Sequence, residues 1–168
     1  MTVLVIMGVS GCGKSTIAAL LAGRLSWPFA EGDDMHPPEN VAKMHAGHPL
    51  TDTDRRPWLE RIAAWIDEQI AAGRSALVTC SALKRSYRDL LRREQVMFVY
   101  LHGDFEVISR RLAARQGHFM PAALLESQFA DLEPPTADEQ AIRVDIGGSP
   151  VELADEITTT LGLVPDHS

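Results

Sequence analysis

Residues 8–15 read GVSGCGKS, and these eight residues are the strongest indication of the fold in the sequence. It fits the pattern G-x-x-x-x-G-K-[ST] through Gly8, Gly13, Lys14 and Ser15. The apolar run VLVIM precedes it, and the helix-like run STIAALLAGRL follows. Glycines allow the backbone to curl so that successive N–H groups point at phosphate oxygens, and the helix N-terminus adds the positive end of its dipole. The sequence therefore predicts a strand, a phosphate-binding loop and a helix, in that order.

The loop also predicts roles for individual side chains. We expect Lys14 to reach the β- and γ-phosphates of a nucleoside triphosphate, and Ser15 Oγ to bind Mg²⁺. The residues expected to contact the nucleotide are Gly8, Gly11, Cys12, Gly13, Lys14, Ser15 and Thr16. The alternative is a glycine turn with a structural role only. Nucleotide binding does not say what the nucleotide is used for, so the purpose has to come from the rest of the chain.

The composition is that of an ordinary globular protein, and it limits the partners. The chain has 168 residues, 45% hydrophobic and 23% charged, which fits one domain over residues 1–168. Its net charge of −7 argues against binding to nucleic acid or an anionic membrane. The first apolar run is too short to span a bilayer and no leader pattern is visible, so we expect a cytoplasmic protein. We expect Cys12 and Cys80 to be small, reduced interior residues.

Apolar runs rich in β-branched residues alternate with helical patterns. Several of these runs are continuous, as in strands that are covered on both faces. The expected strands are Thr2–Met7, Pro28–Glu31, Ser75–Cys80, Val96–Leu101 and Ile142–Ile146. The expected helices are Lys14–Leu25, Pro57–Ala72, Lys84–Arg93, Phe105–Arg115, Ala122–Ala130 and Val151–Leu161. The alternation predicts an α/β fold in which helices flank a parallel sheet.

Motifs that the chain lacks narrow the class of nucleotide-binding protein. A GTPase switch needs a guanine-reading [NT]KxD segment, and none of the three lysines, Lys14, Lys43 and Lys84, lies in one. A motor ATPase usually has an acid at the end of the strand on the Mg²⁺ side, whereas the run SALVTCSALK has Cys80 and Ser81 there. Phosphoryl transfer to a small molecule is the prediction that remains. Because lysine is so scarce here, Lys43 and Lys84 become candidates for the site, although chance explains each equally well.

The second expected strand leads into EGDDMHPPEN, residues 31–40. Ligands of open parallel sheets bind at the carboxyl ends of the strands, so these acids should face the phosphates. Asp33 could hold Mg²⁺ through water or accept the proton of an attacking hydroxyl, and the metal would offset the repulsion between acid and phosphate. Alternatively an acid here caps the next helix, which we favour for Asp34 rather than Asp33. No ligand spacing around His36 indicates a transition-metal site.

A pair of arginines, Arg55 and Arg56, precedes Pro57. We expect Pro57 to start a helix and to hold Arg56 in an extended conformation, because proline restricts the residue before it. A guanidinium at this place could bind a substrate carboxylate through two parallel hydrogen bonds. The alternative for either arginine is a solvated surface position.

A basic segment, SRRLAARQGHFM, follows the fourth expected strand. It contains Arg110, Arg111, Arg115 and His118, and Arg111 and Arg115 share one helix face. In small kinases with a phosphate loop, a lid at this point of the chain closes over ATP and brings arginines to the phosphates. The alternative is a solvated basic helix face.

Taken together, several stretches resemble one family, the small gluconate kinases of the thermoresistant gluconokinase type. The stretches are GVSGCGKS, EGDDMHP, NVAKMHAGHPLTDTDRRPWL, CSALKRSYRDLLR, FVYLHGDFEVI, RLAARQGHFM and LLESQFADLEPP, which run from residue 8 to about residue 135. CSALK, D-x-D-R-x-P-W-L and GHFM are more diagnostic than the phosphate loop. The resemblance implies a fold like that of nucleoside-monophosphate kinases, with a five-stranded parallel sheet and a small lid at about residues 113–130. It also implies an ATP:D-gluconate 6-phosphotransferase with ATP and Mg²⁺ as cofactors, acting as a homodimer.

The resemblance further implies which residues form the site. Asp33 would be the base at the 6-hydroxyl, and Arg55 the clamp for the carboxylate or a hydroxyl. His36, Ser81, Lys84 and His118 would also contact the substrate, Arg111 and Arg115 would be lid residues at the phosphates, and Ser15 and Glu31 would hold the metal. The chain departs from the family in Glu31, where relatives often have Asp, in Asp34, where they often have an apolar residue, and in Cys12, where Ser is frequent.

Two other functions stay open at this point. Another small kinase of the same fold would act on shikimate or a nucleoside monophosphate, but a shikimate kinase would carry a glycine triplet, and no GGG occurs here. A nucleotide-sensing module would bind ATP without turnover. Acceptor-dependent release of ADP would separate these alternatives.

Overall fold

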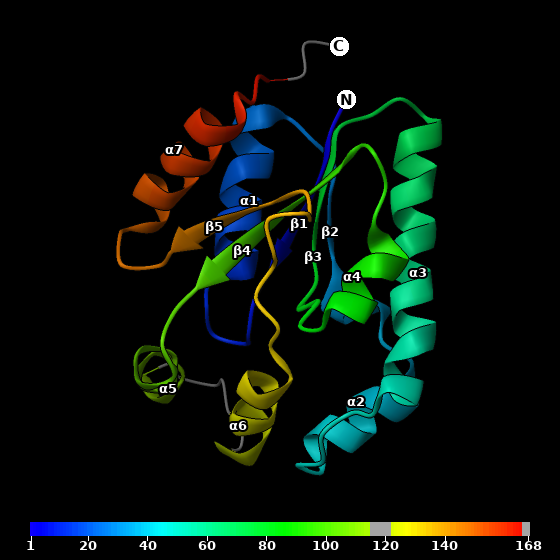
Figure 1. Cartoon of the computed structure of the whole chain (residues 1–168), viewed down its shortest axis with the longest axis vertical. Coiled ribbons are helices and arrows are strands. Elements are labelled where there is room, and N and C mark those ends of the chain that lie inside the picture. The colour runs from blue at the N-terminus through cyan, green and yellow to red at the C-terminus, as the bar shows by residue number, and fades with distance from the viewer. Residues whose placement is uncertain (115–121, 166–168) are drawn as a thin grey trace.

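The computed structural model describes residues 1–114 and 122–165, which fold around a parallel sheet. The strands are β1 (Val3–Met7), β2 (Phe29–Glu31), β3 (Ala76–Thr79), β4 (Val96–His102) and β5 (Ala141–Asp145). Within the described ranges they form one five-stranded sheet in the order β2-β3-β1-β4-β5, and each neighbouring pair is parallel (Figure 1). The predicted α/β fold with a parallel sheet is therefore confirmed.

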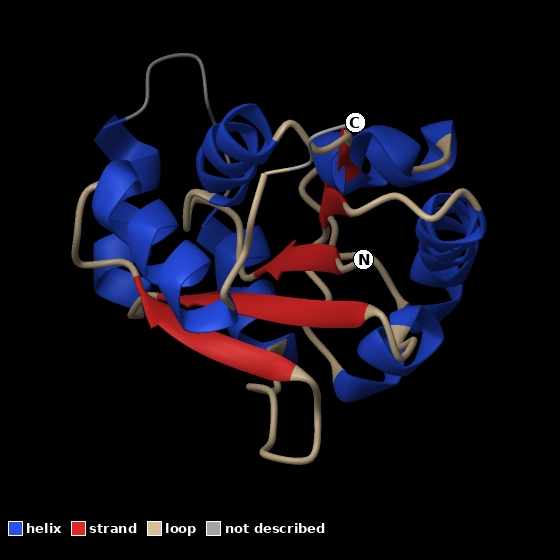
Figure 2. Ribbon diagram, turned by 90° about the horizontal axis from the view of Figure 1, so that it is seen from above, coloured by secondary structure: helices blue, strands red, loops and turns tan. Residues whose placement is uncertain are grey.

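Helices cover both faces of this sheet. They are α1 (Lys14–Leu25), α2 (Pro38–His45), α3 (Asp52–Ala71), α4 (Arg85–Leu91), α5 (Phe105–Ala114), α6 (Ala122–Asp131) and α7 (Pro150–Leu161), with a short 3-10 helix, η1 (Gly32–Met35), after β2. Helices α1 and α7 lie on one face, and α3 and α4 on the other (Figures 1 and 2). Helices α2, α5 and α6 lie beyond the carboxyl ends of the strands, where ligands of such sheets bind (Figure 1).

Strand β1 is the centre of the core, because β3 and β4 pair with its two edges. All of its residues are buried. Since side chains alternate along a strand, Leu4 and Ile6 pack with the α1 and α7 side, while Val3, Val5 and Met7 pack with α3 and α4. Burial on both faces explains why this run is continuously apolar.

Helix α3 starts at Asp52, so the predicted start at Pro57 and the predicted extended conformation of Arg56 are both wrong. A capping box sets the true start. Asp54 N donates to Thr51 Oγ1 at 3.1 Å, and Thr51 N donates to Asp54 Oδ2 at 2.8 Å. Pro57 lies inside the helix, where it removes one backbone donor. The cap and the burial of the following turns against the sheet outweigh that loss.

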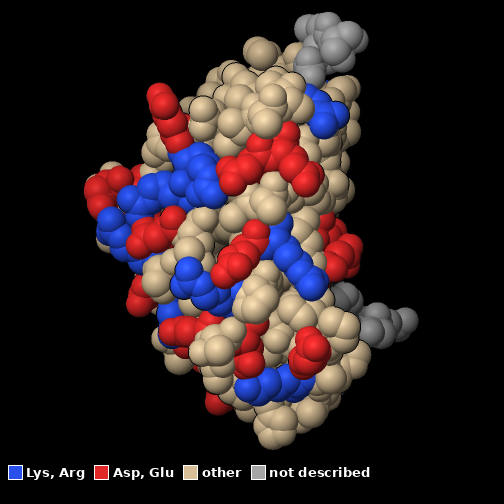
Figure 3. Space-filling model, turned by 90° about the vertical axis from the view of Figure 1, so that its right-hand side faces the viewer, with Lys and Arg blue, Asp and Glu red and all other residues tan. Residues whose placement is uncertain are grey.

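The other predicted helices and strands are present, with ends that differ by one or two residues wherever the structure describes them. Helix α2 was not predicted; it starts at Pro38, and two residues separate it from the end of η1. Across the described residues, no helix combines the length and apolarity needed to cross a membrane. The face formed by α3 and α4 mixes acidic and basic side chains, and ion pairs such as Arg93–Asp67 and Arg56–Glu60 contribute to it (Figure 3).

Candidate active site

Two cavities adjoin the phosphate loop at the carboxyl ends of the strands. The first, of about 270 Å³, is lined by residues of the loop, η1, α2, α3, α6 and the segment after β3. The second, of about 300 Å³, is lined by the loop, α1, α5 and the segment between β5 and α7. Both cavities are lined by residues of the phosphate loop. A ligand in one cavity would therefore approach a ligand in the other at this loop.

The first cavity brings together five of the predicted site residues: Lys14, Asp33, His36, Arg55 and Ser81. The second brings together Gly11, Cys12, Gly13, Thr16 and Arg111. Lys84 lines neither cavity. Arg115 and His118 lie outside the described residues.

The phosphate loop has the backbone that its glycines predict. Gly8, Gly11 and Gly13 have φ values of 144°, 86° and 96°, which side chains disfavour. A Cβ on Gly8 would also lie 2.8 Å from Leu101 O, so the loop could not tolerate one there. Lys14 Nζ donates to the loop carbonyls of Gly8 at 2.8 Å and Val9 at 3.0 Å. The ammonium is thus held at the loop, where a phosphate could replace the carbonyls as its acceptor.

The acidic turn η1 is fastened to the sheet at Gly32. A Cβ on Gly32 would lie 1.9 Å from Thr79 O, so only glycine fits there. Gly32 N donates to Thr79 Oγ1 at 3.2 Å, and Trp58 Nε1 donates to Gly32 O at 2.7 Å. These contacts fix the turn from both sides, and Asp33 follows directly, on the wall of the first cavity.

Glu31, the last residue of β2, lies beside the phosphate loop. Its Oε2 accepts from Ser15 Oγ at 3.0 Å and from Thr79 Oγ1 at 2.6 Å. Glu31 is one methylene longer than the Asp expected at this position, and its carboxylate contacts Ser15. A hydroxyl and a carboxylate together are hard oxygen donors of the kind that Mg²⁺ prefers.

His36 is held against α3 in a defined orientation. Its ring stacks on Trp58 with centroids 4.1 Å apart and an interplanar angle of 14°. Asn40 Nδ2 contacts His36 Nδ1 at 3.2 Å and donates to Asp54 O at 2.8 Å. The amide is a donor, so Nδ1 accepts and the neutral ring carries its proton on Nε2. Burial lowers the pKa of His36 more than nearby Asp33 raises it, which favours this neutral form.

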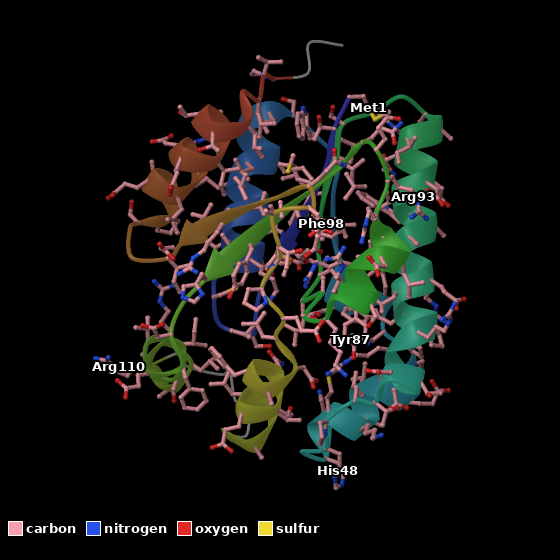
Figure 4. The ribbon with its side chains drawn as sticks, in the orientation of Figure 1. Met1, His48, Tyr87, Arg93, Phe98 and Arg110 are labelled. Atoms are coloured by element: carbon pink, nitrogen blue, oxygen red, sulfur yellow. The ribbon has the colours of Figure 1, made fainter. Side chains whose placement is uncertain are left out.

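Arg55 is a buried cation in the wall of the first cavity. Its Nη1 donates to the Tyr87 hydroxyl at 2.7 Å and to Asp131 Oδ2 at 3.0 Å. The Tyr87 hydroxyl in turn donates to Asp52. Tyr87 comes from α4 and contacts α3 through Arg55 and Asp52; Figure 4 labels its position below α4. Burial lowers the pKa of Arg55, but its hydrogen bonds to Tyr87 and Asp131 outweigh that effect and raise it.

Other basic candidates make contacts away from the cavities. Lys84 Nζ pairs with Asp52 Oδ1 at 3.0 Å, and Lys43 Nζ pairs with Asp54 Oδ2 at 2.7 Å. Arg56 is exposed and pairs with Glu60 one turn along α3. Arg110 points away from the sheet on α5 and donates to Glu106 O at 3.4 Å (Figure 4).

Arg111, in contrast, lines the second cavity. Its Nη2 donates to Ile146 O at 2.8 Å, which holds the guanidinium there.

Ser81 stands in a short loop that a buried ion pair supports. Arg88 Nη1 donates to Ala82 O at 2.8 Å and Leu83 O at 3.2 Å, while Arg88 Nε donates to Glu139 Oε1 at 2.6 Å. Ala82 has a φ of 44°, an unusual value for a residue with a side chain. Ser81 O also accepts from Gly8 N at 3.3 Å, so this loop braces the phosphate loop.

Helix α6 contacts the phosphate loop through Gln128. Its Oε1 accepts from Ser10 N at 2.8 Å, and its Nε2 donates to Ser10 Oγ at 3.1 Å. Ser127 and Leu124, also on α6, line the first cavity with it. Part of the expected lid thus contacts the loop directly.

Sequence reasoning missed five polar residues that organise the site: Thr79, Tyr87, Arg88, Gln128 and Asp131. Four of them lie in the stretches CSALKRSYRDLLR and LLESQFADLEPP, but neither stretch indicates by itself which partner each side chain binds. The partners of Thr79, Arg88 and Gln128 lie 48, 51 and 118 positions away in the chain. Only the fold brings these partners together, so no local signal was available.

Comparisons with known proteins find a matching family model and much closer individual relatives. The sequence model of the shikimate kinase family matches residues 10–161. The gluconokinase of Gluconobacter oxydans is 52% identical over 156 residues, covering 92% of this chain and 88% of the relative. The thermoresistant gluconokinase of Escherichia coli is 44% identical over 152 residues, covering 89% and 87%.

Solved structures give the same grouping. A sugar kinase from Janibacter sp. superposes with a TM-score of 0.93 at 48% identity, covering 98% of this chain and 96% of that one. A gluconokinase from Sinorhizobium meliloti superposes with a TM-score of 0.87 at 44% identity, covering 96% and 91%. The shikimate kinase of Aquifex aeolicus shares only 16% identity at a TM-score of 0.70, covers 96% of both chains and resembles this protein in fold alone.

Proposed function

This chain belongs to the gluconokinase family, and on that premise we propose that it transfers the γ-phosphoryl group of ATP to the 6-hydroxyl of D-gluconate, giving 6-phospho-D-gluconate and ADP. The observation that carries the proposal is the first cavity, whose wall holds Lys14, Asp33 and Arg55 together. A sugar acid needs a cation for its carboxylate and a base for its hydroxyl, and this cavity offers both beside the phosphate loop.

Arg55 is the clamp for the carboxylate. Its Nη1 is already bound to Tyr87 and Asp131, while its Nε and Nη2 have no hydrogen-bond partner in the ranges 1–114 and 122–165. These two nitrogens form the edge of a guanidinium that binds a carboxylate through two parallel hydrogen bonds. Tyr87 and Asp131 therefore orient the free edge, and the buried charge of Arg55 is balanced before substrate arrives.

Asp33 is the general base. It accepts the proton of the 6-hydroxyl as that oxygen forms a bond to the γ-phosphorus, and the bond from phosphorus to the β,γ-bridging oxygen breaks to release ADP. Lys14 lines the same cavity, and its ammonium stabilises the negative charge on the phosphoryl group during the transfer. The Nε2 proton of His36 is available to a hydroxyl of the substrate, and Ser81, which lines the same cavity, offers a further hydroxyl.

The nucleotide occupies the second cavity, with its phosphates over the loop. The backbone donors of Gly11, Gly13 and the start of α1 face anionic oxygens in such loops. Thr16 and Arg111 line this cavity, so Arg111 contacts the nucleotide. Arg115 and His118 stay predicted lid residues. Lys84 stays a predicted substrate contact, although it lines neither cavity and pairs with Asp52.

Magnesium fits the donor set at Ser15 and Glu31, because a hydroxyl and a carboxylate lie within 3.0 Å of each other there. We expect Ser15 Oγ and the phosphates to hold the ion, with the Glu31 carboxylate beside it. When bound, the ion neutralises charge on the β- and γ-phosphates. The homodimer and the cytoplasmic location stay predictions that rest on the resemblance and on the sequence.

One assay tests the function. The purified chain is given MgATP with gluconate, with shikimate, with AMP or with no acceptor, and ADP release is followed through a coupled reaction. Of these four reactions, we expect ADP release only in the one that contains gluconate. Release with shikimate or AMP would reassign the acceptor, and ATP binding without acceptor-dependent release would indicate a nucleotide-binding module.

A further inference from the structure

Strand β3 lies next to β1 and the phosphate loop, yet it supplies no acid to the site. Its last residue is Thr79, followed by Cys80 and Ser81. In the sheet register, Thr79 pairs with Ile6 of β1 on one side and with Glu31 of β2 on the other. The carboxylate beside Thr79 is that of Glu31, which comes from the edge strand β2. In the sheet, β2 is one strand farther than β3 from β1 and the phosphate loop.

Hydrogen bonds at Thr79 have a fixed direction. A threonine hydroxyl has one proton to donate. Gly32 N donates to Thr79 Oγ1 at 3.2 Å, so the hydroxyl accepts there and its own proton goes to Glu31 Oε2 at 2.6 Å. Thr79 is 2% exposed, so water does not compete for this proton. The carboxylate of Glu31 is thus oriented by a buried hydroxyl that is itself oriented by the backbone.

The same carboxylate oxygen also accepts from Ser15 Oγ at 3.0 Å. A hydroxyl that binds a cation uses an oxygen lone pair, so its proton must point away and find an acceptor. Partners of this kind tune metal affinity as the direct ligands do, and losing one typically costs 10–100-fold. Glu31 is in position to be that acceptor.

We propose that Thr79 is a positioning residue for magnesium binding. It holds Glu31 so that an acid from the edge strand accepts the Ser15 proton and turns the Ser15 lone pairs toward the ion. The chain Gly32–Thr79–Glu31–Ser15 thereby replaces the acid that β3 lacks. The proposal rests on the proposed function, because it assumes that MgATP is the phosphoryl donor.

The test measures how much Mg²⁺ strengthens ADP binding. Calorimetry gives the affinity for ADP in Mg²⁺ and in EDTA, for the wild type, Thr79→Val and Thr79→Ser. Valine keeps the shape without the hydroxyl, and serine restores the hydroxyl. We expect Thr79→Val to lose about tenfold or more of the gain from Mg²⁺, with affinity in EDTA within about twofold of the wild type, and Thr79→Ser to keep the gain.

A second variant guards against a folding defect, because valine also removes the acceptor of a buried backbone N–H. Glu31→Gln leaves the Gly32–Thr79 contact in place but weakens the acceptor for Ser15, so it should lose the gain from Mg²⁺ as Thr79→Val does. The KM for MgATP should rise in both variants. Thermal unfolding reports whether each variant is folded.

Two results would overturn the proposal. One is an unchanged gain from Mg²⁺ in both Thr79→Val and Glu31→Gln. The other is an equal loss in Thr79→Ser and Thr79→Val, since the hydroxyl would then be irrelevant. The binding measurement contains no gluconate. If gluconate proved not to be the acceptor, the effect of each variant on Mg²⁺-dependent ADP binding could still be interpreted.

Discussion

Asp33 and Asp34 are adjacent carboxylates on the same turn, but their surroundings differ. Both side chains are exposed, but Asp33 lines the first cavity with Lys14, whereas Asp34 lines neither cavity. A general base must lie within reach of the proton that it removes. Of the two, only Asp33 lines the cavity in which we propose that the hydroxyl binds, so the pair supplies a proposed base and a control one position apart.

Replacing Asp33 with asparagine should therefore slow chemistry without weakening the nucleotide site. We expect kcat for Asp33→Asn to fall on the order of 10²–10⁴-fold, while ADP affinity changes little, because Asp33 does not line the second cavity. Steady-state kinetics and calorimetry would measure both. Asp34→Asn is the matched control and should stay near the wild type. Near-normal turnover in Asp33→Asn would move the base elsewhere.

Arg55 and Arg56 form a second natural pair on α3. Arg55 is buried at the cavity, and Arg56 is exposed and bound to Glu60. Lysine keeps the charge of Arg55 but loses the two-pronged geometry. Losing one charge-assisted hydrogen bond, worth about 1.5–3 kcal/mol, should raise the KM for gluconate roughly 10–100-fold in Arg55→Lys. The KM for ATP should be nearly unchanged, and Arg56→Lys should match the wild type in both. Equal effects at the two positions would refute the clamp.

At the scale of elements, a carboxylate joins α2 to α3. Asp54 caps α3 and also pairs with Lys43 of α2. The hydrogen bonds from Lys43 and then Thr51 lower the pKa of Asp54 from 3.8 to about 2. Because the folded state depresses this pKa, the stabilisation is fully present above 3.8 and is lost as the pH falls toward 2. Both contacts thus fail together in acid.

An NMR titration of the Asp54 carboxyl checks this directly. The wild type should titrate near 2, Lys43→Met should titrate closer to 3.8, and Lys43→Arg should stay low because it keeps a donor. The difference in unfolding temperature between the wild type and Asp54→Asn should shrink over the same pH range. An unchanged Asp54 titration in Lys43→Met would show that Lys43 is not the cause.

Elements whose signals are local were predictable from the sequence. The buried strands and α1 follow from continuous apolar runs and from the glycine loop that ends at Lys14. The start of α3 was misread because Pro57 is a strong local signal, while the box formed by Thr51 and Asp54 is a weak one. Helix α2 was missed because it is short, contains few apolar residues and begins with two prolines, Pro37 at its N-cap and Pro38 at its first position.

The site divides in the same way. Lys14, Ser15 and the acids at the end of β2 stand in readable motifs. The local pattern left Arg55 and Arg56 as equal candidates, and the resemblance selected Arg55, which the fold places at the first cavity while Arg56 is exposed. Thr79 looked like an ordinary residue of a buried strand. Its role depends on a neighbour in the sheet, Glu31, that no short window of sequence contains. Long-range partners are what sequence reasoning lacks here.

At the scale of the whole molecule, the two cavities depend on one brace. The loop that carries Ser81 contacts the phosphate loop, and Arg88 holds it from behind through the carbonyls of Ala82 and Leu83. Arg88 is anchored in turn by Glu139, just before β5. Arg88 of α4 and Glu139 before β5, which line neither cavity, thus support the loop after β3, and through it the phosphate loop.

Breaking this brace should cost far more than breaking a surface ion pair. Removing one partner of a buried pair typically costs about 3–5 kcal/mol, so Arg88→Met should lower the free energy of unfolding in urea by about that amount. Arg93→Met, which removes an exposed pair with Asp67, should cost below about 1 kcal/mol. Equal costs would mean that the buried pair is not a brace.

The double variant Arg88→Met/Glu139→Leu separates stability from positioning. Removing both charges eliminates the unpaired buried carboxylate, so part of the lost stability should return. In both Arg88→Met and the double variant, the carbonyls of Ala82 and Leu83 lack their donor. We therefore expect the Ser81 loop to be displaced and kcat to be below that of the wild type in both variants. Urea unfolding and steady-state kinetics on the same samples measure the two effects. If activity returned in step with stability, Arg88 would serve the fold alone, and the loop would hold its position without it.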